Sequence, residues 1–398
     1  MQGLLHGTKI LDLGRVTAGG FTTQMLGDLG ADVIKIENPE GSKGVSTRSK
    51  IDDPKYYLHG EDVGFMSVNR NKKSIVLDLS KQEGLSVFYD LVKKSNVVFD
   101  NFKPGTLERF QIEYEKLKKI NPEIICCSLT GYGSTGPDAN RAAFDITVQA
   151  SSGMMKQIGK RDEEGRIAYP NIPVGDLLGA MYSAYAIVSA LLHRKQTGKG
   201  CHIDIGMQDA VMSWFILWGL YPINFGIERG LTDKLIWGTF NAKDRPIVIC
   251  AHREAPWQNL CRALGHLEWL EDDRFRTPAK RIENRDLLWS LIEEALSAKE
   301  SNEWFKIFDK EGVPYSSLNS MSEALASPQA LHRNMVVAVD HPKGGTIKLL
   351  GNPIKVKGLK EAFSHPPLLG EHTQEILSEL LKYPEEKIVT LKKDGVVA

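Results

Sequence analysis

The 398-residue sequence has few cysteines and no excess charge of either sign. Its five cysteines form no Cys-x-x-Cys pair and have no metal-ligand spacing around them, so they predict neither a zinc site nor a disulfide framework; they are Cys126, Cys127, Cys201, Cys250 and Cys261. Lysine and arginine together number 50, as do aspartate and glutamate. This balance gives no reason to expect nucleic acid or an anionic membrane as the main partner. We therefore expect a small-molecule substrate and no bound metal.

The sequence also lacks a secretory signal and a long apolar run. Residues 8–14 already have the pattern of a strand, with no basic and apolar region before them. No apolar run approaches the roughly 20 residues of a membrane span. With 42% hydrophobic and 25% charged residues, the chain has an ordinary globular composition and is long enough for two or three cores. We expect a soluble, cytoplasmic protein with its cysteines reduced.

Several common catalytic motifs are missing as well. The sequence has no Gly-x-x-x-x-Gly-Lys-Ser/Thr, no Gly-x-Ser-x-Gly and no His-Glu-x-x-His. Residues 131–136, Gly-Tyr-Gly-Ser-Thr-Gly, match the dinucleotide fingerprint in form. However, Pro137 and Asp138 follow where a phosphate-binding helix should continue, and no acidic residue stands at the expected spacing. A bare glycine loop is favoured, and an NAD-dependent oxidoreductase stays a remote alternative.

Short apolar runs alternate with helical patterns over the first two hundred residues. Strands are predicted at residues 10–13, 31–37, 74–79, 97–101 and 124–130, and helices at 22–29, 82–94 and 105–120. This alternation is typical of an α/β fold with a mainly parallel sheet. Further on, helices at 257–264, 285–296 and 302–310 indicate a second, smaller domain, before a hairpin over 336–356, with its turn at 342–345, and a final helix at about 371–381.

Asp176 is the candidate nucleophile. It stands at the start of a helix that runs to Arg194, where free backbone N–H groups and the helix dipole favour the ionised form of a carboxylate. An ionised, positioned carboxylate can attack a thioester. The alternative interpretation is that Asp176 only caps the helix.

Two basic stretches lie at or near strand ends. Residues 101–105, Asn-Phe-Lys-Pro-Gly, follow a predicted strand, with Arg109 one turn further on. Ligands of open α/β sheets bind at the carboxyl ends of strands, so Asn101, Phe102 and Lys103 are placed to meet a phosphate-bearing cofactor. The other stretch, Asn69–Lys73, precedes its strand, and we interpret residues 70–73 as a solvated turn.

The ordered motifs resemble those of one family, the class III CoA-transferases, also called the formyl-CoA and carnitine CoA-transferase family. The resemblance covers almost the whole chain. It rests on residues 10–13, 16–19, 25–37, 69–74, 101–105, 121–122, 128–133, 144–145, 149–150, 152–153, 175–176, 197–200, 272–275 and 369–372.

The resemblance implies a fold and an assembly. It implies an α/β subunit with a Rossmann-like large domain, residues 1–200 completed by 330–398. A linker at 201–225 and a smaller α+β domain at 226–329 would follow, and two subunits would interlock as a ring-like homodimer.

The resemblance also implies a mechanism and a set of site residues. Asp176 would accept an acyl group from acyl-CoA as a mixed anhydride and then carry CoA as an aspartyl thioester. Coenzyme A is then a substrate, with no permanently bound cofactor. Asp145 would line the pocket, and the CoA contacts would be Arg15, Val16, Ala18, Asn101, Phe102, Arg109, Gly131, Tyr132 and Gly133.

Some positions depart from related patterns. The α-methylacyl-CoA racemases of the same fold have a histidine where this chain has Phe144, which cannot transfer a proton, so a racemase is the second hypothesis and a silent CoA-binding subunit another. Residues 225–233 have only two glycines where formyl-type members have a glycine-rich loop, which argues against formate and oxalate as substrates. Arg15 would meet either a CoA phosphate or a substrate carboxylate. Five aromatic residues would line an apolar acyl pocket or else belong to a core or interface; they are Trp214, Phe215, Trp218, Tyr221 and Trp237.

Overall fold

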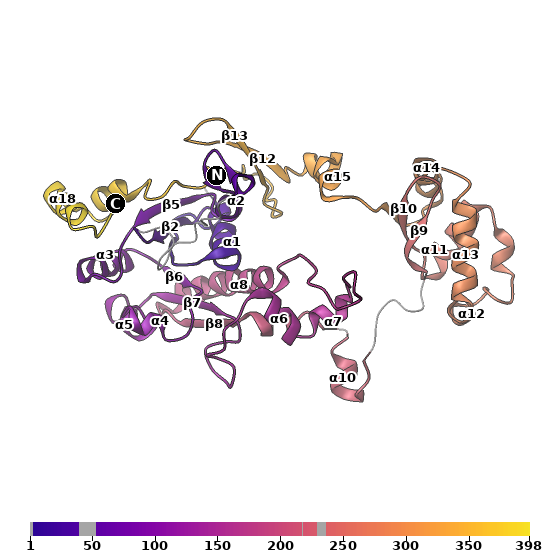
Figure 1. Ribbon diagram of the computed structural model, residues 1–398, viewed down its shortest axis with the longest axis horizontal. Coiled ribbons are helices and arrows are strands. Elements are labelled where there is room, and N and C mark those ends of the chain that lie inside the picture. The colour runs from indigo at the N-terminus through magenta and orange to yellow at the C-terminus, as the bar shows by residue number, and fades with distance from the viewer. Residues whose placement is uncertain (1–2, 40–52, 217, 229–235) are drawn as a thin grey trace. The chain divides into compact units, whose positions relative to one another are not determined.

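The computed structural model describes residues 3–39, 53–216, 218–228 and 236–398. The chain divides into two compact units (Figure 1). Unit 1 comprises Met1–Ile216 together with His332–Ala398, and unit 2 comprises Leu217–Leu331. Residues 229–233 of the segment compared with the glycine-rich loop lie outside the described residues.

Unit 1 is built on a six-stranded sheet in the order β5-β2-β1-β6-β7-β8. All neighbouring strands are parallel, which confirms the predicted α/β class. The strands are β1 Lys9–Asp12, β2 Asp32–Glu37, β5 Lys72–Val76, β6 Val97–Asp100, β7 Ile125–Thr130 and β8 His202–Gly206. Strand β8 pairs with β7 along its length, so the first part of 201–225 belongs to the sheet and is not a linker.

Helices cover both faces of this sheet, and the strand residues alternate between two cores. Ile10, Val97 and Phe99 belong to the core shared with α1 (Val16–Asp28), α8 (Val174–Thr197) and α9 (Met207–Met212). Leu11 and Val98 belong to the opposite core, shared with α3 (Gln82–Lys93), α5 (Tyr114–Ile120) and residues 376–397 of the returning chain. A period of two with both faces buried is the signature of a parallel sheet between helical layers.

The longest helix, α8, is central to unit 1. It ends at Gly198, which adopts the left-handed conformation (φ +68°) that a C-terminal cap requires, after a basic last turn. It packs on α1, β7 and α9. By length and composition alone α8 is also apolar enough to cross a membrane, which corrects the expectation that no apolar segment reaches that length. Core helices of soluble proteins meet the same criterion, and residues such as Leu178 and Ile187 are buried against the sheet.

Unit 2 has an antiparallel sheet in the order β11-β10-β9 with helices packed on it. Its strands are β9 Trp237–Asn241, β10 Pro246–Cys250 and β11 Tyr315–Ser317. Its helices are α10 Leu220–Phe225, α11 Glu254–Leu264, α12 Pro278–Glu283, α13 Arg285–Leu296, α14 Ser301–Glu311, α15 Met321–Ala326 and α16 Pro328–His332. The core is rich in aromatic side chains, among them Phe240, Trp257 and Phe308, all fully buried.

The remaining elements belong to unit 1. They are β3 Tyr57–Leu58, β4 Glu61–Asp62, α2 Val63–Ser67, α4 Thr106–Arg109, α6 Asp145–Ser151, α7 Met154–Ile158, the hairpin β12 Val336–Asp340 with β13 Thr346–Leu350, α17 Thr373–Glu375 and α18 Glu385–Lys393. The hairpin turns at the predicted place.

Three predicted helices differ in their bounds. Helix α1 starts at Val16, six residues before the predicted start. Gly19 and Gly20 weaken the helical pattern in the sequence, but they pack so closely against Gly14 and Val68 that a side chain would not fit. The segment 105–120 is split by Gln111, which has φ +59°. The predicted final helix is α17 plus a π-helical turn at Ile376–Leu380, and it is not the last, because α18 follows and buries Ile388 and Leu391.

Candidate active site

The order in which the chain adds strands to the sheet reverses at one point, between β1 and β6. From β1 the chain builds β2 and β5 on one side, and it then returns to lay β6, β7 and β8 on the other. Turns that follow the two strands therefore diverge and leave a crevice at their carboxyl ends, the usual ligand site of such sheets. Asn101, after β6, ties the turns together, since its Oδ1 accepts the Arg15 N–H at 2.8 Å and its Nδ2 donates to the Arg15 carbonyl at 3.0 Å.

A cavity of about 740 Å³ opens at this crevice. It brings together nine of the predicted site residues, which are Arg15, Val16, Ala18, Asn101, Phe102, Arg109, Gly131, Asp145 and Asp176. Tyr132 and Gly133 do not line it. The Tyr132 ring is buried with Arg141 stacked over it, at 5.4 Å from the guanidinium carbon to the ring centroid. The glycine loop of 131–136 is followed by a turn at 137–140 and irregular chain up to residue 144, and no phosphate-binding helix continues from it, as was expected of a bare loop.

Asp145 is held by four hydrogen bonds. Its Oδ1 accepts the backbone N–H groups of Gly175 and Asp176, at 2.7 and 3.2 Å. Its Oδ2 accepts from Gln149 Nε2 at 2.6 Å and from the Tyr169 hydroxyl at 2.8 Å. Asp145 thus caps the N-terminus of α8 from a neighbouring helix, which stabilises negative charge at that point.

Asp176 lies in the first turn of α8 and lines the same cavity. Its carboxylate accepts no hydrogen bond from the residues that the structure describes. Burial, and then the charge of Asp145, raise the pKa of Asp176 to about 7. The expectation that the helix terminus keeps this group readily ionised is therefore wrong, because Asp145 takes the N–H groups on which it rested. A carboxylate with no hydrogen-bond donor and a raised pKa, in a cavity, is a candidate functional group.

Two arginines form a positively charged wall of the cavity. The guanidinium carbon of Arg15 lies 4.8 Å from the centroid of the Phe102 ring, and that of Arg109 lies 4.9 Å from the centroid of the Phe110 ring. The centroids of the two phenylalanine rings are 6.5 Å apart. Neither arginine pairs with a carboxylate within the described ranges, and Arg15 Nε is buried without a partner there. Burial and the charge of Arg109 lower the pKa of Arg15. Two unpaired guanidiniums on rigid supports favour an anionic ligand.

The stretch Asn69–Lys73 is not the solvated turn predicted from its charge. Arg70 is 4% exposed and forms a two-pronged pair with Asp28, through Nε at 2.9 Å and Nη2 at 2.6 Å. Lys72 is also 4% exposed and donates to Asp12 Oδ2 at 2.9 Å. Of the three charged residues in this stretch, only Lys73 is partly exposed, and it pairs with Glu375. Arg70 and Lys72 can be buried because carboxylates from distant parts of the chain neutralise their charges.

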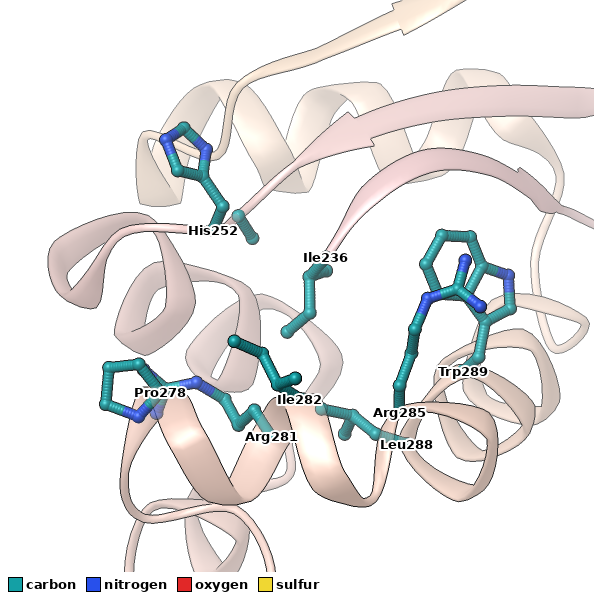
Figure 2. Close-up of a pocket in the computed structure, with 9 residues that line it drawn as sticks. Ile236, His252, Pro278, Arg281, Ile282, Arg285, Leu288 and Trp289 are labelled. Carbon is teal, nitrogen blue, oxygen red and sulfur yellow. The ribbon is translucent and has the colours of Figure 1, made fainter. Parts of the chain in front are cut away.

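Unit 2 has a small hollow of its own, lined by Ile236, His252, Arg281, Arg285 and Trp289 among others (Figure 2). Figure 2 shows the Arg285 side chain alongside the Trp289 indole, and the guanidinium carbon lies 4.3 Å from the ring centroid. The enclosed space of about 20 Å³ has room for one water molecule and no substrate.

Of the five aromatic residues considered for an acyl pocket, Trp214 and Phe215 belong to unit 1, and neither lines the cavity at Asp176. Trp214 and Trp237 are 52% and 45% exposed, Trp237 stacks on His252, and Phe215 packs against the α8 core. All five cysteines are free thiols. In the described ranges no cluster of histidine, cysteine, aspartate and glutamate has the makeup of a metal site.

Sequence reasoning missed two side chains that shape the site. Tyr169 lines the cavity and donates to Asp145. The fully buried Gln149 donates to Asp145 from α6 and lies behind the cavity lining. Gln149 stands four residues after Asp145, one helical turn, which is a signal that the sequence carries. Tyr169 comes from an irregular segment and has no such signal.

Comparison with known proteins identifies relatives over the whole chain. The profile of CoA-transferase family III matches residues 5–373. The human succinyl-CoA:glutarate CoA-transferase is 34% identical, over 99% of this chain and 90% of its own length. The acetyl-CoA:oxalate CoA-transferase of Acetobacter aceti is 36% identical, over 97% and 98%. The crystal structure of a CAIB/BAIF family protein from Brucella suis superposes with a TM-score of 0.82 at 33% identity, over 96% of this chain and 100% of that one.

Proposed function

The chain belongs to CoA-transferase family III, and from this premise we propose that it moves CoA from an acyl-CoA donor to a carboxylic acid by covalent catalysis on Asp176. The contrast between the two carboxylates of the cavity carries the proposal. Asp145 accepts four hydrogen bonds, whereas Asp176 accepts none from the described residues. Asp176 is therefore the carboxylate that is free to attack.

The chemistry proceeds in four substitutions. The Asp176 carboxylate attacks the thioester carbonyl, CoA leaves as thiolate, and a mixed anhydride forms on the enzyme. The thiolate attacks the aspartyl carbonyl and releases the donor acid, which leaves an aspartyl-CoA thioester. The acceptor carboxylate attacks this thioester and forms a second anhydride, from which the thiolate takes the new acyl group. Asp176 is regenerated, and water must be excluded throughout.

The developing oxyanion needs hydrogen-bond donors, and the backbone N–H groups at the N-terminus of α8, beside Asp176, are candidates. In the structure the N–H groups of Gly175 and Asp176 are bonded to Asp145. A donor role for them requires that Asp145 share or release these groups when the acyl group is bound.

The test is chemical trapping on Asp176. The protein is mixed with a panel of acyl-CoA thioesters, which includes the succinyl and acetyl donors named in the relatives, and quenched with hydroxylamine. An activated aspartyl group becomes a hydroxamate, which peptide mass spectrometry would place at Asp176. CoA binding without an adduct on any thioester would instead favour proton-transfer chemistry, seen as deuterium exchange at the substrate α-carbon, or a silent binding subunit.

The arginine wall is proposed to bind the phosphates of CoA. Replacing Arg109 with alanine is expected to raise KM for acyl-CoA roughly 10- to 100-fold, the loss of a charge-assisted contact to phosphate. The same variant should leave KM unchanged for the matching N-acetylcysteamine thioester, which has no phosphates. Arg166→Ala, in an exposed ion pair outside the cavity, is the control. An equal effect on both thioesters would contradict phosphate binding.

The same comparison decides the role of Arg15. If Arg15→Ala raises KM for acyl-CoA but not for the N-acetylcysteamine thioester, Arg15 binds a CoA phosphate. If it raises KM for both thioesters, Arg15 binds a substrate carboxylate.

The raised pKa of Asp176 predicts that activity falls at acid pH. Because only the ionised carboxylate attacks, kcat/KM should fall as the pH drops through about 7. Asp145→Asn removes the neighbouring charge and should move this fall to lower pH. The asparagine oxygen can still accept the Gly175 and Asp176 N–H groups, and its new amide nitrogen can donate to the Tyr169 hydroxyl oxygen. If the fall of kcat/KM at acid pH is unchanged in Asp145→Asn, the pH dependence does not come from the Asp145–Asp176 pair.

We also propose a homodimer with interlocked subunits. Helix α8 has an exposed apolar stripe at helical spacing, Met181, Tyr185, Val188 and Leu192, exposed by 51, 72, 39 and 59%. Such a stripe on a core helix is typical of a subunit interface. Interlocked subunits cannot separate without unfolding, so sedimentation should show a dimer at every dilution. A monomer that appears on dilution would contradict interlocking.

A further inference from the structure

The turn after β1 has an unusual backbone. Val16 adopts φ +52°, in the left-handed region, although its side chain is β-branched and 67% exposed. A β-branched residue rarely adopts this conformation, and it persists only where the surroundings fix it. Val16 and Arg15 both line the cavity, so the strained turn shapes the proposed CoA site.

A buried group of charges lies directly under this turn. It consists of Asp12, Lys35, Lys72 and Thr23, here named the turn-holding cluster, and all four are at most 4% exposed. Asp12 Oδ1 accepts the Gly14 N–H at 2.7 Å, and Lys35 Nζ donates to the Gly14 carbonyl at 2.7 Å. Both polar groups of the residue before Arg15 are therefore fixed by buried ions.

The other contacts hold Asp12 and α1 in place. Lys72 Nζ donates to Asp12 Oδ2 at 2.9 Å and to the Gly20 carbonyl of α1 at 2.8 Å. The Thr23 hydroxyl donates to Asp12 Oδ2 at 2.7 Å. Opposing charges lower the pKa of Asp12 despite its burial, and burial lowers that of Lys72 to about 8. The charge of the buried Glu37 also favours the ionised form of Lys72. Buried ion groups of this kind are costly inside a protein, so stability alone does not account for them.

We propose that Lys35, acting with Asp12, is a positioning residue for CoA binding that fixes the Gly14 peptide and so presents Arg15 and Val16 to the ligand. The inference rests on the proposed function, in which these two residues contact CoA. Lys35 itself touches no ligand, because its ammonium is buried beneath the turn.

The test separates positioning from bulk stability. Lys35→Met is expected to raise KM for acyl-CoA about tenfold, the size of one lost charge-assisted hydrogen bond. Its kcat should change by less than about threefold, since Asp176 is untouched. Arg70→Met removes another buried cation, from the pair with Asp28 outside the cavity lining, and should lower Tm without raising KM. An equal KM in both variants would overturn the proposal.

A milder pair of variants covers the case in which Lys35→Met does not fold. Thr22 and Thr23 are adjacent and fully buried, but Thr22 donates to the Ala18 carbonyl of its own helix, and Thr23 donates to Asp12. Thr23→Val should raise KM about threefold and Thr22→Val should not. Equal KM values in these two variants would also overturn the proposal. Failure of the wild-type protein to bind acyl-CoA or form the hydroxamate would instead refute the proposed function, so the two failures are distinguishable.

Discussion

Replacing Asp176 with asparagine is expected to lower kcat for CoA transfer on the order of 10⁴-fold or more while CoA still binds. The amide has nearly the same shape as the carboxyl group, so the cavity should persist, but it cannot form the anhydride. Binding should survive because the arginine wall belongs to the turns after β1 and β6 and to α4, not to α8. Steady-state transfer assays and calorimetric binding of CoA measure the two effects separately.

The control for this substitution is Asp162→Asn, a change of the same kind on an exposed loop outside the cavity. It should transfer CoA at the wild-type rate. The hydroxamate should be absent from Asp176→Asn and present in Asp162→Asn. Full transfer activity in Asp176→Asn would refute covalent catalysis on this residue and leave the family fold with another mechanism.

The parallel sheet was predictable because short apolar runs mark most of its strands and helical patterns separate them. In β6, Val97 and Phe99 are buried on one face of the sheet and Val98 on the other, and this continuous burial is visible as a short apolar run. The carboxyl-end rule then placed Asn101 and Phe102 at the crevice. Helix α13 was predicted with its observed bounds because its amphipathic pattern is complete within the segment.

Features that depend on distant partners were not predictable. Arg70 and Lys72 resemble a surface turn in sequence, and only the fold brings Asp28 and Asp12 to them. The pKa of Asp176 has the same origin, since the local helix terminus favours ionisation, but Asp145 captures that terminus from α6. Local patterns and the family resemblance therefore predicted residues that line the cavity, and long-range contacts determine the protonation of Asp176.

Removing Asp28 is expected to destabilise unit 1 by about 3–5 kcal/mol, because it leaves the Arg70 guanidinium buried without a counter-charge. Both side chains of this pair are at most 4% exposed. Arg70 also donates to the Leu350 carbonyl and stacks over Phe363, so it joins the start of β5 to the returning C-terminal segment. In Asp28→Ala, Tm should fall by roughly 10 °C, measured by thermal unfolding.

The matched control is the ion pair Lys73–Glu375, which joins the same two parts of the chain but is 40% exposed at both side chains. Solvent screens such a pair, so Glu375→Ala should cost less than about 1 kcal/mol. If both variants lose the same stability, the effect comes from detaching the C-terminal segment and not from burying an unpaired charge. A further change, Arg70→Met in the Asp28→Ala background, should recover part of the loss, because it removes the uncompensated charge and keeps an apolar side chain in its place.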